Sequence, residues 1–144
     1  MAIGSSTRER ARAEQLGEPR ILIAVAEGDV SAILKSDDVT RTIEWYRRMG
    51  FEIRSVFPES GEPSWCEVAR DGVILQFLGG DTPWPGPPSF TGTLYFRPES
   101  VNALHEQIKV HTTPAWGPEV REWGTRELGV QDPDGYFLTF TEPA

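Results

Sequence analysis

An internal repeat constrains the fold of this chain more than any other feature of its sequence. With an offset of 62, residues 31–35 align with residues 93–97. With an offset of 63, residues 70–77 align with residues 133–140. Two matches at nearly the same offset indicate a duplication, and a difference of one residue is an ordinary change in loop length. The chain is therefore expected to contain two copies of one structural unit.

The first copy is predicted to begin with a strand and a helix. Residues 30–35 form the candidate strand, and Asp38 can cap the helix that follows. The apolar residues Val39, Ile43 and Tyr46 have the spacing of one helix face. Three further strands are predicted, at 51–57, 65–70 and 73–78. The Asp71-Gly72 pair between the last two is typical of a tight hairpin.

The second copy repeats this order. At the offset of 62, Asp38-Val39 aligns with Ser100-Val101, so a second helix is predicted to begin there. Its apolar residues Val101, Leu104 and Ile108 again have helical spacing. The 14 glycines and 12 prolines indicate many turns, which argues against a bundle of long helices. The sequence predicts an α+β fold of two βαβββ modules, at about 30–80 and 91–142.

The length of the chain fits one globular domain, which we place at residues 21–144. A short apolar run at 21–25 is a candidate strand. Residues 1–20 are charged and have only Ile3 and Leu16 as large apolar side chains. That segment cannot bury enough surface to order itself, so a flexible N-terminal arm is expected.

The charge of the chain argues against nucleic acids and membranes as partners. Fourteen basic and 22 acidic residues give a formal net charge of −8. Such a surface repels phosphate backbones and anionic lipids, and it favours cationic ligands. The sequence has no apolar run of membrane-spanning length and no apolar secretion signal, so a cytoplasmic protein is expected. The single cysteine, Cys66, excludes an intrachain disulfide and is predicted to be a small buried thiol.

Two motifs carry a resemblance to a known superfamily. Residues 43–52, I-E-W-Y-R-R-M-G-F-E, resemble the pattern F-Y-x-x-L-G-F-E. The segments 123–127 and 132–136 resemble W-G-x-R-E and D-P-D-G-N. With the duplication, these motifs resemble the vicinal oxygen chelate superfamily of glyoxalase I, bleomycin resistance proteins and extradiol dioxygenases, and most closely its bleomycin-resistance-like members. The resemblance implies a half-open β-cup with the helices outside and the ligand inside, and a homodimer with ligand clefts between its two chains.

The resemblance also gives the positions where metal-using members carry their ligands. These positions hold Ser31, Gln76, Thr93 and Thr139 in this chain. Catalytic first-row metals need about three carboxylate or imidazole ligands, whereas three hydroxyls and one amide bind such ions weakly. We therefore expect no metal and no other cofactor, and no catalytic residue is assigned.

The same positions predict which side chains face the cup, because alternate residues of a strand share a face. The resulting cavity is apolar and aromatic with neutral polar groups, which suits a bulky aromatic or cationic small molecule. The tryptophans expected in or beside its rim are Trp65, Trp84, Trp116 and Trp123, whereas Trp45 is expected in the core or an interface. The predicted ligand-binding residues are Trp65, Gln76, Thr93, Tyr95, Trp123, Phe137 and Thr139.

Three functions stay open at this point. The first is a metal-free protein that sequesters its ligand, as bleomycin resistance proteins do. The second is a glyoxalase-like enzyme, namely a lyase, isomerase or dioxygenase acting on a small metabolite, with Glu67, Glu127 and Tyr95 as its only candidate proton-transfer groups. Glu127 is equally explained by an internal ion pair beside Arg126 or by a dimer contact. The third is a structural or regulatory domain without a small ligand.

Overall fold

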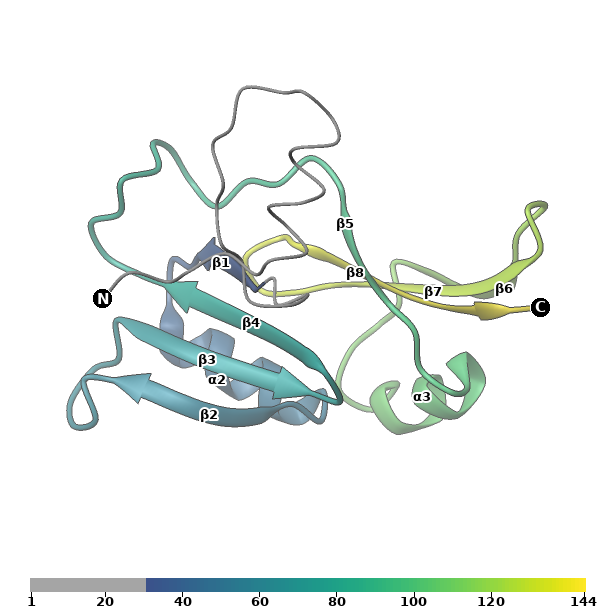
Figure 1. Cartoon of the computed structure of the whole chain (residues 1–144), viewed down its shortest axis with the longest axis horizontal. Helices are drawn as coiled ribbons and strands as arrows, with labels where there is room; N and C mark the ends of the chain where they lie inside the picture. Colours follow the sequence, from purple (N-terminus) through teal and green to yellow (C-terminus); the bar gives the residue numbers. More distant parts are fainter. Residues whose placement is uncertain (1–30) are drawn as a thin grey trace, which may run out of the picture. The chain divides into compact units, whose positions relative to one another are not determined.

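The computed structural model describes residues 31–144, and the predicted arm and the predicted strand at 21–25 lie outside this range (Figure 1). The first module comprises β1 (Ala32–Lys35), α2 (Val39–Arg48), β2 (Glu52–Phe57), β3 (Trp65–Arg70) and β4 (Val73–Leu78). The second comprises β5 (Thr93–Phe96), α3 (Val101–Ile108), β6 (Trp116–Val120), β7 (Thr125–Gln131) and β8 (Phe137–Pro143). Neither helix of this part of the chain is long and apolar enough to cross a membrane.

The two modules have the same sheet topology, which confirms the predicted α+β fold of two βαβββ units. The strand order is β1-β4-β3-β2 in the first sheet and β5-β8-β7-β6 in the second. In each sheet the first strand pairs in parallel with the last, and all other pairs are antiparallel. The helix of each module lies in the connection between its first and second strands. A long connection of this kind allows the first strand to pair in parallel with the last.

Local sequence signals account for the position of both helices. The Asp38 side chain caps α2 by accepting from the Arg41 N–H at 2.9 Å, and Ser100 caps α3 in the same way. Each helix buries the apolar stripe predicted for it. Helix α2 ends at Arg48, and Gly50 follows its C-cap with a φ of +84° that suits glycine. A β-carbon at Gly50 would lie 2.8 Å from an Arg70 nitrogen.

One row of aromatic rings runs through the core from the first module into the second. The Tyr46 ring lies 4.8 Å from Phe77 and 5.1 Å from Phe51. The Phe51 ring lies 6.2 Å from Phe96 of β5, which stacks on Phe140 of β8 at 5.2 Å. All five rings are buried. The two modules therefore share one core rather than having one each.

The β7–β8 turn joins the second module to α2, and we call this contact the closed joint. The Asp134 side chain has no exposed surface and accepts from three groups around the start of α2. These donors are the Asp37 N–H at 3.0 Å, the Arg41 guanidinium at 3.1 Å and the Thr42 hydroxyl at 3.0 Å. Asp134, expected from the sequence only to form a turn, also links the two modules.

A second carboxyl group of the same turn lies deeper in the closed joint. Asp132 accepts from the Tyr46 hydroxyl at 2.8 Å and from the backbone N–H groups of Asp134 and Tyr136 at 2.9 Å. Burial raises the pKa of Asp132 to about 6, although the Tyr46 hydrogen bond acts in the opposite direction. Tyr136 completes the joint by donating to the Lys35 carbonyl at 2.8 Å.

Candidate functional site

The candidate site lies on the face of the second sheet that α3 does not cover, which we call the helix-free face. Leu138 and Phe140 of β8 belong to the core under the helices, so the alternate residues Thr139 and Thr141 point to the opposite face. The strand register places Tyr95 of β5 beside Thr139. It likewise pairs Glu127 of β7 with Thr141.

A buried carboxylate organises this face. Glu127 is only 3% exposed, and its Oε1 atom accepts from three side chains. These are the Tyr95 hydroxyl at 2.8 Å, the Trp123 indole N–H at 3.2 Å and the Thr125 hydroxyl at 3.0 Å. The Arg121 Nε atom lies 3.5 Å from Oε2 and forms an ion pair. We call these five residues the Glu127 cluster.

The cluster keeps Glu127 ionised. Burial alone would raise the pKa of Glu127, but hydrogen bonds from Tyr95, Trp123 and Thr125 and the charge of Arg121 together lower it below its usual value. The hydrogen bond to Glu127 in turn raises the pKa of Tyr95, which stays a donor. An internal ion pair of Glu127 was one of the expectations from the sequence. Its partner is Arg121 rather than the neighbouring Arg126, which points to the other face and pairs with Glu142 at 3.1 Å.

Two aromatic rings of the cluster reach solvent. Trp123 is 62% exposed and Tyr95 is 49% exposed. The indole N–H of Trp123 and the hydroxyl of Tyr95 nevertheless both donate a hydrogen bond to the same buried Glu127 oxygen. The Arg121 guanidinium lies 5.6 Å from the centre of the Trp123 ring and covers one of its faces. The other face of the indole is therefore the one available for stacking.

A third ring, Trp116, lies flat on the same face. It rests against Gly129, where a β-carbon would come within 2.1 Å of the indole, and against Phe137 at a ring distance of 5.5 Å. The Trp116 indole N–H and the Thr141 hydroxyl are buried and have no hydrogen-bond partner among the described residues.

Replacing Gly129 with alanine tests the packing of the Trp116 indole against Gly129. We expect G129A to lower the free energy of unfolding by about 2 kcal/mol, because the added methyl group overlaps the indole ring. Urea denaturation followed by circular dichroism measures this change. In the background of Trp116→Ala the same substitution should have little effect, since the overlapping ring is gone. Equal effects in both backgrounds would contradict the contact.

The first sheet carries a smaller polar group on its own helix-free face. Gln76 donates to the Ser31 hydroxyl at 3.4 Å and accepts from the Trp65 indole N–H at 3.2 Å. In the second sheet the equivalent residues Thr93 and Thr139 lie with their hydroxyl oxygens 2.6 Å apart. The structure thus brings together, within each sheet, the two positions that the family resemblance assigned to metal ligands.

The chemistry of these four positions does not fit a catalytic divalent metal. They supply three hydroxyls and one amide, which are already hydrogen-bonded to each other or to neighbours. Residues 31–144 contain no group of three or more histidine, cysteine, aspartate or glutamate side chains arranged to hold an ion. No metal-dependent reaction is therefore proposed for these four residues.

Several further predictions from the sequence concern single residues. Cys66 is fully buried, as predicted, and burial raises the pKa of its thiol to about 11. Trp45 is partly buried against the core. The binding role of the seven predicted site residues stays a prediction. Arg121 and Thr125, the partners of Glu127, were not predicted from the sequence. The alternation of residues along one strand places Thr125 and Glu127 on one face and is a signal for that pair.

The comparisons with known proteins identify a family. Residues 30–140 match the family described as "Glyoxalase/Bleomycin resistance protein/Dioxygenase superfamily". Among curated proteins, the uncharacterized protein YetH of Bacillus subtilis (strain 168) is 27% identical over 100 residues, which are 68% of this chain and 82% of YetH.

Solved structures share the fold. TioX from Micromonospora sp. ML1 has a TM-score of 0.67 at 19% identity, covering 81% of this chain and 100% of TioX. A bleomycin resistance determinant encoded on the transposon Tn5 has a TM-score of 0.62 at 24% identity, covering 80% and 97% of the two chains. A bleomycin-binding protein solved in complex with bleomycin has a TM-score of 0.60 at 25% identity, covering 81% and 98%.

Proposed function

The chain belongs to the glyoxalase/bleomycin resistance protein/dioxygenase superfamily, and from this premise we propose that it is a metal-free binding protein that sequesters a bulky aromatic or cationic compound. The observation that carries the proposal is the Glu127 cluster. One buried carboxylate holds two exposed aromatic rings, Tyr95 and Trp123, in fixed orientations. Rings that are already ordered lose little conformational entropy when they stack on a ligand.

The electrostatics of the chain support a ligand that carries positive charge. The formal net charge is −8, which attracts cations to the surface. Within the site, Glu127 is neutralised by Arg121 and three donors, so the site itself offers aromatic faces and neutral hydroxyls. The ligand is therefore attracted by the whole molecule and held mainly by stacking. Trp65, Gln76, Thr93, Phe137 and Thr139 are proposed to contribute further contacts.

The alternative of an enzyme has weaker support. The lowered pKa of Glu127 and its three hydrogen-bond donors make it a poor general base. The raised pKa of Tyr95 makes it a poor general acid. Of the three proton-transfer groups expected from the sequence, this leaves only Glu67, which points to the helix-free face of the first sheet beside Gln76.

We further propose that two copies associate through their helix-free faces, with the ligand clefts between the chains. Ile33 and Phe57 of the first sheet are exposed, and both alternate with residues that pack on the core. They lie on the two edge strands of that sheet, and exposed large apolar side chains favour burial against another surface. A homodimer provides such a surface without a second gene product.

A fluorescence titration tests the binding function. We expect bleomycin or proflavine, a planar cation, to quench tryptophan emission to saturation. Trp123→Ala should weaken binding about tenfold, because one stacking face is lost. The matched control Trp45→Phe changes a tryptophan on α2 and should leave the affinity unchanged. Absence of quenching and of any change in melting temperature with both compounds would contradict sequestration, and sedimentation of the same samples at the 16.1 kDa monomer mass would contradict the dimer.

A further inference from the structure

The two modules are related by duplication, yet the contacts between them differ at equivalent places. In the repeat alignment, Asp71 in the β3–β4 turn corresponds to Asp134 in the β7–β8 turn. Asp134 is fully buried in the closed joint, whereas the Asp71 side chain is 100% exposed. We call the region between the β3–β4 turn and α3 the open joint.

Smaller side chains explain why the open joint is not filled. Arg41, which pairs with Asp134, corresponds to Ala103 in the second module. Tyr136, whose ring helps to fill the closed joint, corresponds to Val73 in the first. At these two positions the open joint lacks a guanidinium group and a phenol ring, although Arg70, which aligns with Pro133, brings a guanidinium group beside Asp71. A cavity of about 660 Å³ lies there, lined by Asp71, Val73 and Ala103 among others.

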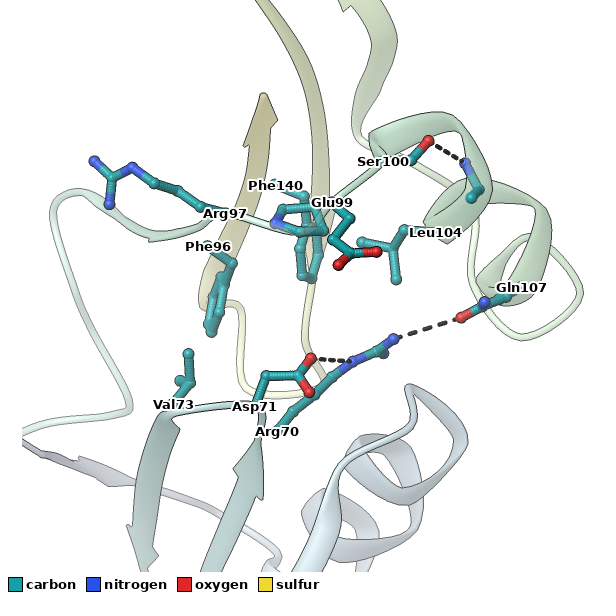
Figure 2. Close-up of a pocket in the computed structure, with 12 residues that line it drawn as sticks. Arg70, Asp71, Val73, Phe96, Arg97, Glu99, Ser100, Leu104, Gln107 and Phe140 are labelled. Atoms are coloured by element: carbon teal, nitrogen blue, oxygen red, sulfur yellow. Dashed lines mark hydrogen bonds and ion pairs between the residues drawn. The ribbon is translucent and has the colours of Figure 1, made fainter. Parts of the chain in front are cut away.

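The cavity has an apolar wall formed by side chains from both modules. Figure 2 shows Val73 and Phe96 on one side and Phe140 and Leu104 further along. Phe96 and Phe140 point away from the helix-free face, because they alternate with Tyr95, Thr139 and Thr141. The cavity is thus separate from the candidate site. Its volume suits a small organic molecule.

The basic groups around the cavity are already engaged or point elsewhere. Arg70 donates to the Met49 carbonyl and to Gln107 at 3.4 Å, and its Nε atom lies 3.9 Å from Asp71. Figure 2 shows the Arg97 guanidinium directed away from the other labelled side chains. Neither arginine is placed to bind an anion inside the cavity.

The acidic groups are the ones still available. Glu99 lines the cavity and is exposed. In Figure 2 its side chain extends toward the turn that carries Asp71. Asp71 has a long ion pair with Arg70, whose Nε atom lies 3.9 Å from the Asp71 carboxylate. A bound molecule therefore meets carboxylates at the mouth and apolar side chains at the wall, which is complementary to a cation with an apolar body.

We propose that the open joint binds an amphipathic organic cation, with an aryl group against Phe96, Leu104 and Phe140 and an ammonium or guanidinium group between Asp71 and Glu99. Such a ligand supplies the two groups that Tyr136 and Arg41 supply in the closed joint. The site is a second one, independent of the proposed function of the helix-free face.

Isothermal titration calorimetry with 2-phenylethylamine tests this site on the full chain. We expect saturable binding of the amine, and binding at least tenfold weaker for 3-phenylpropionate, which has the same ring and the opposite charge. Glu99→Gln should weaken amine binding about fivefold, the effect of one partly exposed charge pair. The control Glu59→Gln, at an exposed position on the β2–β3 connection, should leave it unchanged.

A second variant fills the site from within. Ala103→Arg restores the missing guanidinium, so it should abolish amine binding while the circular dichroism spectrum stays that of the parent protein. Trp123→Ala should leave amine binding unchanged, which separates this site from the helix-free face. Equal binding of the amine and the carboxylate, or unchanged amine affinity in both Glu99→Gln and Ala103→Arg, would overturn the proposal.

Discussion

Replacing Asp134 with alanine is expected to lower the free energy of unfolding by about 2 kcal/mol. The side chain has no exposed surface, and its removal deletes one hydrogen bond each from the Asp37 N–H, the Arg41 guanidinium and the Thr42 hydroxyl. Arg41 is 47% exposed and the Thr42 hydroxyl keeps the Ser36 hydroxyl as a partner, so solvent and Ser36 recover part of the loss. Urea denaturation at neutral pH measures the change.

The duplication provides a matched control for this prediction. Asp71 is the repeat equivalent of Asp134, and its side chain is fully exposed. Asp71→Ala should lower the free energy of unfolding by only about 1 kcal/mol, because alanine tolerates the backbone φ of +47° less well than aspartate. If the two substitutions had equal effects, Asp134 would be a turn residue only, and the closed joint would not hold the modules together.

The second large effect is a dependence of stability on pH that originates at Asp132. The pKa of Asp132 in the folded protein, about 6, lies above the ordinary aspartate value of 3.8. A carboxyl group whose pKa is raised by folding contributes stability below pH 3.8, and that contribution is lost as the pH rises through 6. The loss between pH 4 and pH 7 amounts to about 2 kcal/mol.

Asp132→Asn isolates this contribution. The amide oxygen can accept from the backbone N–H groups of Asp134 and Tyr136, and the amide nitrogen can donate to the Tyr46 hydroxyl. We expect the variant to gain stability relative to the parent protein as the pH rises from 4 to 7. Urea denaturation of both proteins at several pH values measures the difference. A constant difference across this range would contradict a raised pKa at Asp132.

Much of the fold follows from local sequence signals. Strands β3 and β4 have the predicted bounds, because apolar runs on both sides of Asp71-Gly72 leave little choice of register. Strand β2 begins at Glu52 rather than at the predicted Phe51. Phe51 instead belongs to the end of α2, where its N–H donates to the Tyr46 carbonyl at 3.0 Å. The repeat itself predicted that the two halves would be topologically alike.

The candidate site was predictable only in part. The family resemblance assigned Thr93, Thr139, Ser31 and Gln76 to equivalent ligand positions, and the structure brings Thr93 into contact with Thr139 and Ser31 into contact with Gln76. The partner of Glu127 was not predictable, because it depends on the irregular register of β6 against β7, beyond which Arg121 returns to the carboxylate. Sequence adjacency pointed to Arg126, but adjacent residues of a strand face opposite ways.

The contacts of Asp134 could not be predicted from the composition of its turn. An aspartate before a glycine favours a turn whatever lies beside it. Its three acceptor contacts reach residues more than 90 positions earlier in the chain, and only the docking of the second module onto α2 brings them close. No local pattern encodes such a distance.

The row of rings from Tyr46 to Phe140 has a consequence for the history of the duplication. Since Phe51 of one half rests against Phe96 of the other, neither half retains a complete interior when it is separated from its sibling. A single half therefore needs a second copy to complete that interior, and the duplication supplies both copies in one chain. The two halves can then differ in sequence from each other, provided that the row of aromatic rings they share is preserved.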